Sequence, residues 1–490
     1  MTTRRNLLKS SLSLAAAPVG MSVAIEVAHA EDMPKWNNET DVLVLGYGNA
    51  GSNAAIAAAD AGAKVLILEK TPAGGGNVSV SSGGFVVPTN KEDYYKFQKA
   101  LYELSRSEWD KDLLDLFCEE SLHLGDYVSS LAPEGKIGVY GHAGYQNLPG
   151  ADCVNKMSMR NVPGAKGGDR LFGIFDRAVK ARNIPVLVNC PARRLVRRGN
   201  EVLGVEAVYE GNPYFVKANK AVVICTGGFQ SNPELMARYI YGNPMAKRNF
   251  RKRVAEMDFI ENGVKAGIAM VTRQPAFIWV DQDGKRFVNE KKLDYHCSWM
   301  AVNNFDAINH RYPRIPCFMI MDSSYLKAGP LISNGGSGWA INRESYKWSK
   351  DNQKEIDSGV IIKADTIEEL AKKLGIADPS VLSATVKRWN SDLREKGIDT
   401  EYGRTLTADP NMKAVFVGRD VKSWSAPIEE GPFYAVKLVP VTYHTMGGPK
   451  KSVKAEVLDP FGQPIPRLYV AGELGSTWGL TYQGACANAD

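Results

Sequence analysis

Three glycines near the start of the chain have a spacing that could support cofactor chemistry. Gly46, Gly48 and Gly51 follow the pattern GxGxxG, and Glu69 comes 18 residues after the last of them. In a dinucleotide site, the first glycine allows a tight turn, the second admits a pyrophosphate, and the third lets a helix and a strand pack closely. A carboxylate at the position of Glu69 can accept hydrogen bonds from ribose hydroxyls. The alternative is a glycine-rich turn without a ligand.

The elements around these residues favour the dinucleotide site. The apolar run Val42–Leu45 predicts a buried parallel strand. The alanine-rich segment Ser52–Ala61 predicts a helix that ends at Gly62, and Val65–Leu68 predicts a second strand. Strand, glycines, helix, strand and acid in this order are typical of a Rossmann-like α/β fold. In that fold the helix N-terminus faces the phosphates.

A second group of small residues follows Glu69. Such a loop can lay its backbone N–H groups against a flavin and its phosphates, although it could instead be a flexible surface loop. The residues concerned are Gly74, Gly75, Gly76, Asn77, Ser79, Ser81, Ser82, Gly83 and Gly84.

The middle of the chain alternates helical and strand patterns. Lys91–Leu131 is amphipathic with helical spacing, and its role is predicted to be structural. Ala221–Cys225 is an apolar strand that ends at the tight turn Thr226-Gly227-Gly228. The other predicted elements are a helix at Gly168–Ala181 and strands of a small meander at Val186–Asn189, Val202–Tyr209 and Tyr214–Ala218.

Composition excludes several functions. The net charge is +6 over 490 residues, and no basic run contains interleaved aromatic residues, which makes nucleic acid an unexpected partner. The seven cysteines are scattered, without a CxxC or CxxCH motif, so we expect neither a thiol-redox pair nor a haem attachment site.

The first 30 residues are expected to lie outside the fold. Arg4 and Arg5 precede the weakly apolar stretch Ser11–Val27, and Ala28-His29-Ala30 has the form of a cleavage site. This arrangement resembles a twin-arginine signal peptide, which implies export of a folded protein to the periplasm. The alternative is an uncleaved membrane anchor. No later stretch of the sequence could span a bilayer.

Motifs along residues 38–490 resemble the fumarate reductase / succinate dehydrogenase flavoprotein family, whose relatives include urocanate reductase and the 3-ketosteroid dehydrogenases. The glycine fingerprint, the loop GGGN…SSGG and AVVICTGGF carry the first part of this resemblance. Three later stretches extend it in the order of the family. They are DGKRFVNE at 283–290, ADTIEEL at 364–370, and PFY at 432–434 with HTMGG at 444–448 and LYVAGE at 468–473.

The resemblance implies an α/β FAD-binding domain that is interrupted by an inserted α+β capping domain. We therefore expect a signal peptide at 1–30, the first part of the FAD-binding domain at 38–235, the capping domain at 236–364, and the second part of the FAD-binding domain at 365–490. The FAD should be bound non-covalently, because the loop from Asn77 to Gly84 lacks the histidine that tethers FAD in the respiratory complexes.

The FAD-binding residues that we expect on this basis lie in four segments and at the C-terminal end. They are Gly46, Gly48, Asn49, Ala50, Gly51, Glu69, Lys70, Gly75, Gly76, Asn77, Ser82, Gly83, Gly84, Ala192, Thr226, Gly227, Gly228, Gly472, Glu473 and Ala487. The last residues resemble the start of a final helix whose N-terminal dipole stabilises the reduced flavin, and this helix is expected to be incomplete.

The implied reaction is hydride transfer from flavin N5 to an activated C=C bond, with the protein supplying a hydrogen bond to the developing charge and a proton to the other carbon. His444 in the HTMGG segment is our candidate for the oxygen-binding group; the alternative is a histidine that is satisfied in a turn. Arg286 is a weaker catalytic candidate, since arginines at this position are commonly structural in the family.

Two departures from the family concern the substrate. No arginine stands in the segment Lys291–His296, where the family has its acid, so Tyr295 or His296 could donate the proton. Tyr482 falls where the family has an arginine that clamps a carboxylate, and a phenol offers one hydrogen bond in place of a bidentate pair. These changes disfavour fumarate and favour an uncharged or singly charged enone, enoate or aromatic substrate. Trp299, Trp339 and Trp478 could line such a pocket.

The prediction is therefore a periplasmic FAD-dependent reductase that receives electrons from a separate cytochrome c or a quinol-linked donor. One alternative is a dehydrogenase that runs the same chemistry in the oxidative direction, like the 3-ketosteroid relatives. Another is a flavin electron-transfer or sensing protein without substrate turnover.

Overall fold

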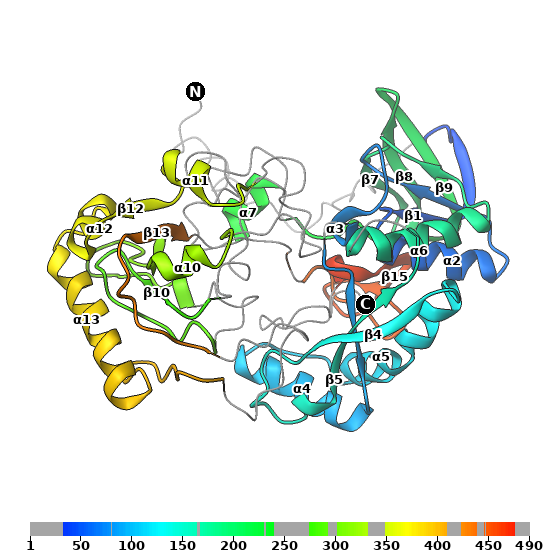
Figure 1. The fold of residues 1–490 in the computed structure, drawn as a ribbon. Coiled ribbons are helices and arrows are strands. Elements are labelled where there is room, and N and C mark those ends of the chain that lie inside the picture. Colours follow the sequence, from blue (N-terminus) through cyan, green and yellow to red (C-terminus); the bar gives the residue numbers. More distant parts are fainter. Residues whose placement is uncertain are drawn as a thin grey trace, which may run out of the picture. The chain divides into compact units, whose positions relative to one another are not determined.

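The computed structural model describes residues 33–79, 81–163, 167–229, 232–239, 274–292, 301–331, 348–408, 423–438, 445 and 447–475. The described residues form three β-sheets with helices packed against them (Figure 1).

The first sheet is built around β1 (Asn38–Leu45), which pairs in parallel with β2 (Val65–Leu68) and with β9 (Asn212–Ile224). β6 (Val186–Leu187) extends the sheet beyond β2, and β15 (Pro464–Val470) extends it beyond β9. The main order is β14-β15-β9-β1-β2-β6, where β14 is Glu456–Leu458, and two further strands join this sheet through β9. β15 comes from the C-terminal part of the chain, so both ends of the described sequence are needed to complete this sheet.

Alternation along β1 determines what covers each face of this sheet. Val42 and Val44 belong to one apolar cluster with α2 (Asn49–Asp60) and α6 (Gly168–Ala181), which lie along the same face in Figure 1. Leu43 belongs to the other cluster, with residues of the antiparallel meander. The meander comprises β7 (Ala192–Arg198), β8 (Glu201–Tyr209) and β9. The predicted Rossmann-like α/β arrangement is confirmed.

The predicted helix over Lys91–Leu131 is two helices, α4 (Lys91–Leu104) and α5 (Lys111–Leu131). Two local signals outweigh the continuous apolar pattern. Arg106 has a positive φ of 51°, which a helix does not allow. Asp110 then caps the second helix by accepting hydrogen bonds from the backbone N–H groups of Asp112 and Leu113.

The second sheet has three antiparallel strands in the order β3-β5-β4, which are Gly84–Pro88, Val154–Arg160 and Lys136–His142. α3 (Gly76–Ser79) precedes β3, and the 3₁₀ turn η1 (Ala151–Cys153) leads into β5. The register of β4 shifts between Val139 and Gly141, so Tyr140 is the extra residue of a β-bulge.

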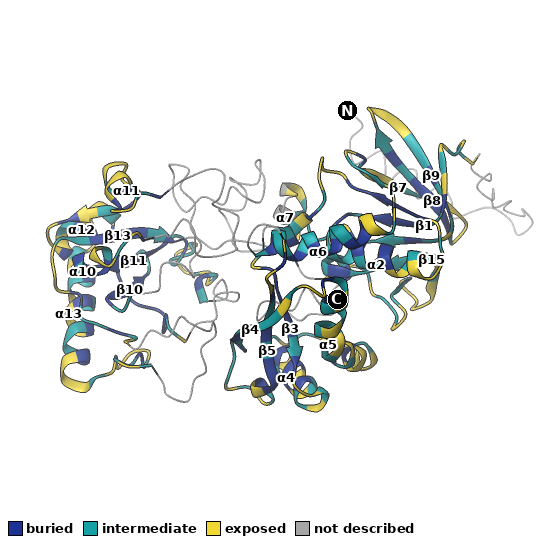
Figure 2. Cartoon of the chain, turned by 45° about the vertical axis from the view of Figure 1, so that its right-hand side comes forward, coloured by how far each residue is buried: buried dark blue, intermediate teal, exposed yellow. Residues whose placement is uncertain are grey.

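The third sheet has the order β10-β11-β13-β12, and all of its pairings are antiparallel. The strands are Phe277–Val280, Cys317–Met321, Phe433–Leu438 and Ile362–Ala364. Its two central strands and β10 are largely buried (Figure 2). α12 (Ile367–Leu374) and α13 (Pro379–Lys396) cover one face through side chains such as Leu370, Val386 and Trp389.

The predicted boundary between residues 364 and 365 falls inside this third sheet. β12 ends at Ala364, and β13 lies beyond the boundary, yet both belong to the sheet of β10 and β11. The apolar faces of α12 and α13 pack on the same strands. Residues 365–438, as far as they are described, therefore contribute to the same sheet and apolar cluster as residues before the predicted boundary.

The remaining short elements are α7 (Pro233–Tyr239), α10 (Ser323–Lys327), α11 (Gln353–Asp357) and the 3₁₀ turn η5 (Gly472–Gly475). Within the described ranges, no helix combines the length and the apolar character that a membrane crossing requires.

Candidate active site

The glycine fingerprint lies where β1 turns into α2, and its geometry requires glycine at two positions. Gly46 has a φ of 104°, and a Cβ added there would overlap the carbonyl oxygen of Cys225 at the end of β9. A Cβ added at Gly51 would overlap the carbonyl oxygen of Gly46. The first and third glycines thus permit the close approach of turn, helix and neighbouring strand that a dinucleotide site needs.

The N-terminus of α2 is suited to an anion. Gly48 is the N-cap residue and provides no side-chain cap, and the first turn carries no acidic residue. The first N–H groups of the helix therefore lack a side-chain acceptor and add to the positive end of the helix dipole. Asn49 Oδ1 is buried and has no hydrogen-bond partner among the described residues. The N–H groups of the helix end and its dipole fit a bound pyrophosphate, whereas Asn49 Oδ1 is an acceptor and does not.

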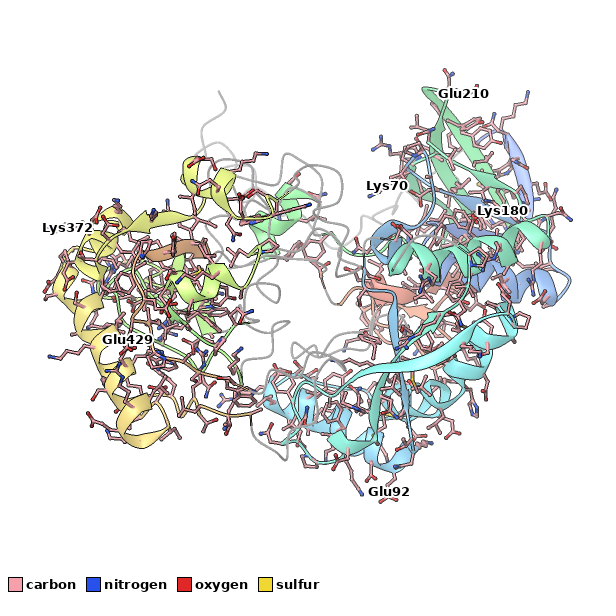
Figure 3. All side chains as sticks on the ribbon, viewed as in Figure 1. Lys70, Glu92, Lys180, Glu210, Lys372 and Glu429 are labelled. Carbon is pink, nitrogen blue, oxygen red and sulfur yellow. The ribbon has the colours of Figure 1, made fainter. Side chains whose placement is uncertain are left out.

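Glu69 lies at the end of β2 with an exposed fraction of 7%. Its Oε2 accepts a hydrogen bond from Tyr47 N (2.9 Å), and its Oε1 accepts from Thr71 N (2.8 Å) and Thr71 Oγ1 (2.6 Å). These contacts hold the carboxylate beside the glycine turn, and each oxygen can accept more than one hydrogen bond. Lys70, labelled in Figure 3, is exposed, and Ala192 is an exposed residue at the start of β7.

The glycine-rich loop is held by backbone contacts rather than being a flexible surface loop. Gly75 N donates to Tyr47 O (2.7 Å), and Gly168 N at the start of α6 donates to Ser81 O (2.9 Å). A Cβ at Gly83 would overlap the backbone of Gly167. Within this loop, Gly75, Gly83 and Gly84 are buried, Asn77 is partly buried, and Gly76 and Ser82 are exposed.

Glu473 joins several of the predicted cofactor segments. Its Oε1 accepts a hydrogen bond from Thr445 N (2.8 Å), and its Oε2 accepts one from Asn77 Nδ2 (3.0 Å). Thr445 Oγ1 in turn accepts from Phe229 N (2.9 Å), directly after the turn Thr226–Gly228. Burial raises the pKa of Glu473 to about 7, although hydrogen bonds from Thr445, Asn77 and Gly228 act in the opposite direction.

Arg286, the weaker catalytic candidate, lies in a buried ion-pair cluster. Its Nη2 is 2.9 Å from Glu290 Oε2, and its Nη1 is 2.6 Å from Asp399 Oδ2. Arg404 Nη1 also contacts Glu290 Oε2 (3.2 Å) and donates to Phe277 O (2.6 Å). The side chain of Arg286 is only 1% exposed. These contacts favour a structural role for Arg286 within the third sheet and its helices.

Lys291 follows this cluster directly in sequence. Its Nζ lies 5.2 Å from the centroid of the Phe277 ring. Burial, together with the nearby positive charge of Arg404, lowers the pKa of Lys291 to about 7. The sequence shows two adjacent lysines and gives no indication that Lys291 would be buried beside Arg404.

Tyr140 is a further residue that sequence reasoning missed. The bulge in β4 directs its side chain so that a Cβ added at Gly84 would overlap the Tyr140 hydroxyl. Bulges often re-aim a side chain beside a functional site. Gly138 and Gly141 around Tyr140 are the only local signal, and they do not reveal which residue the tyrosine approaches.

Several predicted residues lie outside the described part of the chain. They are the catalytic candidates His444, Tyr482, Tyr295 and His296, the FAD candidate Ala487, and the proposed pocket residues Trp299, Trp339 and Trp478. Their roles remain predictions from sequence. The described residues contain no group of three or more His, Cys, Asp or Glu side chains that could hold a metal ion.

Most of the described residues that the sequence assigned to FAD come from separate parts of the chain and meet at one place, although no contact above joins the exposed Lys70 or Ala192 to them. The glycine turn, the loop at Asn77, the turn at Gly228 and the segment at Glu473 are connected by the contacts above. An anion-binding helix end, a fixed acid and a loop of buried glycines fit the diphosphate and ribose groups of FAD.

Comparisons with known proteins agree with this assignment. The family described as "FAD binding domain" matches residues 41–488. A fumarate reductase (cytochrome) from Shewanella frigidimarina is 30% identical, with 93% of this chain and 75% of that protein covered. A urocanate reductase from Eggerthella lenta is 26% identical over 92% of this chain and 72% of that protein.

A solved structure extends the comparison to the fold. The 3-ketosteroid delta1-dehydrogenase from Sterolibacterium denitrificans, in complex with 1,4-androstadiene-3,17-dione, superposes with a TM-score of 0.73 at 22% identity. The alignment covers 92% of this chain and 96% of that chain. This likeness concerns the fold alone.

Proposed function

The chain belongs to the FAD binding domain family and is an FAD-dependent oxidoreductase acting on CH–CH groups, and from this premise we propose that it reduces an activated C=C bond. The substrate is an enoate or enone, in which a carbonyl or carboxylate withdraws electrons from the double bond. The observation that carries the proposal is the Glu473 network, which links the FAD segments to Thr445, the residue after His444.

The protein residues have separate tasks in this reaction. When bound, the reduced flavin supplies a hydride to one carbon of the double bond. The α2 N-terminus, Glu69 and the loop at Asn77 bind the cofactor, which we propose is held non-covalently. His444 hydrogen-bonds the substrate oxygen on which negative charge develops, and Tyr295 or His296 gives the proton to the other carbon.

The unit built on the third sheet is proposed to be the capping domain. Its described parts lie within residues 274–438, and its two apolar faces are filled by its own side chains and helices. The buried ion pairs of Arg286 and Arg404 connect segments within this unit and support its moving as one body. A rigid cap can close over a cofactor as a unit and exclude water from the reacting groups.

The substrate class follows from Tyr482. A phenol cannot replace the bidentate carboxylate contact of an arginine, and therefore a substrate with a second carboxylate is disfavoured. Two of the relatives are named for fumarate and urocanate. We propose an uncharged or singly charged substrate for this chain.

Export and electron supply complete the proposal. Arg4 and Arg5 support transport to the periplasm by the twin-arginine route. We propose that electrons arrive from a separate cytochrome c or a quinol-linked protein.

An anaerobic experiment tests the function. The FAD-loaded protein is reduced with dithionite, and the return of the oxidised-flavin absorbance is followed after adding cinnamates, methacrylate, a 3-ketosteroid enone, urocanate or fumarate. Rapid reoxidation by a monocarboxylate or an uncharged member is expected. Rapid reoxidation by fumarate contradicts the substrate class, and no reoxidation by any member contradicts the reductase.

The second candidate is a dehydrogenase of the same bond. The neutral Tyr482 favours it. Electron transfer to or from artificial dyes distinguishes a dehydrogenase from a reductase. A dehydrogenase reduces an oxidised dye when a saturated substrate is supplied, whereas a reductase oxidises a reduced viologen when the alkene is supplied. A protein that does neither while exchanging electrons with dyes is an electron-transfer flavoprotein.

A further inference from the structure

The end of the glycine-rich loop is confined by two different neighbours. At Gly83, the three atoms nearest to an added Cβ are backbone atoms of Gly167 and Gly168, at the start of α6. At Gly84, the three nearest atoms are the hydroxyl, Cε1 and Cζ of Tyr140. A methyl group at either glycine would therefore overlap its neighbour. The two positions differ because the neighbour of Gly84 is a side chain, whereas the neighbour of Gly83 is backbone.

Tyr140 reaches Gly84 across an intervening strand. The order of the second sheet is β3-β5-β4, and Ser158 on β5 is paired with Gly84 on one side and with Gly138 on the other. Adjacent strands lie about 4.8 Å apart, so a side chain from β4 that meets β3 must lie along the surface of the sheet. The short side chain of Ser158 and the missing one of Gly84 leave space for a ring on that face. The bulge in β4 re-aims the tyrosine into this space.

This contact lies at the far end of a loop that is held by cofactor segments at its start. Gly75 N donates to Tyr47 O beside the glycine turn (2.7 Å), and Asn77 Nδ2 donates to Glu473 Oε2 (3.0 Å). The end of the loop, at Gly84, continues into β3. The conformation of the loop between these points therefore depends on what supports Gly84.

We propose that Tyr140 is a positioning residue for FAD. Its ring supports the end of the loop at Gly84, so that the backbone N–H groups of the loop face the cofactor. Gly84 and Tyr140 act as a matched pair, in which one residue lacks a side chain because the other fills the space. The inference goes beyond the proposed function, because it depends on FAD binding and not on the substrate or the direction of electron flow.

A double-mutant cycle tests the pair. FAD is added to the cofactor-free protein, and quenching of flavin fluorescence gives the Kd. Gly84→Ala should raise the Kd by more than about tenfold, because the methyl group displaces the loop from Tyr140. Tyr140→Ala should raise it less, since the loop loses a support without being pushed away. The variant with both changes should bind FAD at least about fivefold more tightly than Gly84→Ala, because the methyl group enters the space that the ring has left.

Gly83 provides the matched control. Gly83→Ala should also weaken FAD binding, but its methyl group meets the backbone at Gly167, which truncation of Tyr140 does not remove. Adding Tyr140→Ala to Gly83→Ala should therefore recover no affinity. Tyr140→Phe keeps the ring and should retain both the wild-type Kd and the visible circular dichroism of the bound flavin. Tyr140→Ala should change that spectrum, which reports the surroundings of the flavin and not the stability of the fold.

Three results would each overturn the proposal. The first is a double variant of Gly84 and Tyr140 that binds FAD no better than Gly84→Ala. The second is an equal recovery in the Gly83 control, and the third is a Tyr140→Ala protein with unchanged Kd and flavin spectrum. Far-ultraviolet circular dichroism of the cofactor-free proteins shows which variants fold. If Gly84→Ala does not fold, the proposal requires that the double variant folds and binds FAD, and failure of both overturns it.

Discussion

At the scale of single residues, the third sheet contains a balanced group of buried charges. Arg286 and Arg404 provide two positive charges, and Glu290 and Asp399 provide two negative ones. Burial alone would raise the pKa of Glu290, but the two guanidinium groups outweigh it and hold that pKa below its ordinary value. Removing one member leaves an unpaired charge in a medium that solvates it poorly.

We therefore expect Glu290→Gln to lower the free energy of unfolding by about 3–5 kcal/mol, because two arginines lose their shared carboxylate. Chemical denaturation followed by circular dichroism measures the change. The control is Glu429→Gln, which removes an exposed ion pair with Arg394 (Glu429 is labelled in Figure 3) and should cost less than about 1 kcal/mol. Equal losses in the two variants would contradict the argument.

Lys291 adds a potential fifth charge to this group and makes stability depend on pH. Its pKa is about 7 in the folded protein, below the ordinary value of a lysine. Between pH 7 and the ordinary lysine pKa, the unfolded chain binds more protons than the folded one, so stability rises with pH in this window. Lys291→Met should reduce this rise and stabilise the protein at pH 7 by more than about 1 kcal/mol. The control is Lys292→Met at an exposed position, which should change neither the rise of stability with pH nor the stability at pH 7. Denaturation curves at several pH values measure both quantities.

The glycine turn gives a prediction for the cofactor. Gly51→Ala places a methyl group where the carbonyl oxygen of Gly46 lies, so α2 must shift away from β1. We expect the Kd for FAD to rise by more than about tenfold, because the helix end and the turn no longer act together. The control is Gly173→Ala inside α6, where the added Cβ meets Arg177 Nη1 at an ordinary 3.6 Å. If both variants retain wild-type flavin, the turn does not bind it.

At the scale of elements, local signals predicted more than long-range ones. Patterns of apolar residues and glycines gave the bounds of β2 and α6 as observed, because these elements depend on nearby residues. The split between α4 and α5 was missed, since one residue with positive φ outweighs a long amphipathic pattern. β7 was not predicted, because its four arginines obscure the alternating apolar pattern of a strand. Among the described strands, β7 pairs only with β8, and charged side chains on such an edge strand disfavour pairing with another chain.

In the candidate site too, features that depend on nearby residues were predicted and features that depend on distant segments were not. The glycines that bind the diphosphate could be predicted because their requirement for close approach is local. The hydrogen bond between Asn77 and Glu473, the approach of Tyr140 to Gly84 and the domain limit at residue 364 depend on how distant segments fold together. No spacing in the sequence contains that information.

The motif ADTIEEL at 364–370, which belongs to the family resemblance, forms the N-terminal cap of α12 and so has a structural role. Thr366 Oγ1 accepts a hydrogen bond from Glu369 N (3.1 Å), and Glu369 Oε2 accepts one from Asp365 N (2.9 Å). Thr366→Ala should lower the free energy of unfolding by about 1 kcal/mol, while Thr366→Ser should retain most of the cap. Thermal denaturation compares them, and a loss in Thr366→Ser as large as that in Thr366→Ala would show that the methyl group matters instead.

At the scale of the whole molecule, export is expected to depend on the arginine pair. Replacing Arg4 and Arg5 by lysines should retain the protein in the cytoplasm in folded, FAD-containing form, because the twin-arginine route reads the pair itself. Cell fractionation and flavin fluorescence of each fraction measure this. Normal periplasmic accumulation of the lysine variant would contradict the route that we propose.

The position of β15 between β14 and β9 in the first sheet has a consequence for synthesis. β9 pairs with β15, and Glu473 comes three residues after that strand ends. A ribosome must therefore release the chain through Glu473 before the sheet is complete and the three segments that Glu473 joins can meet. The third sheet likewise waits for β13. FAD contacts that need all three segments can therefore form only after β15 and Glu473 have been synthesised, so a nascent chain that stops before β15 presents an incomplete cofactor site.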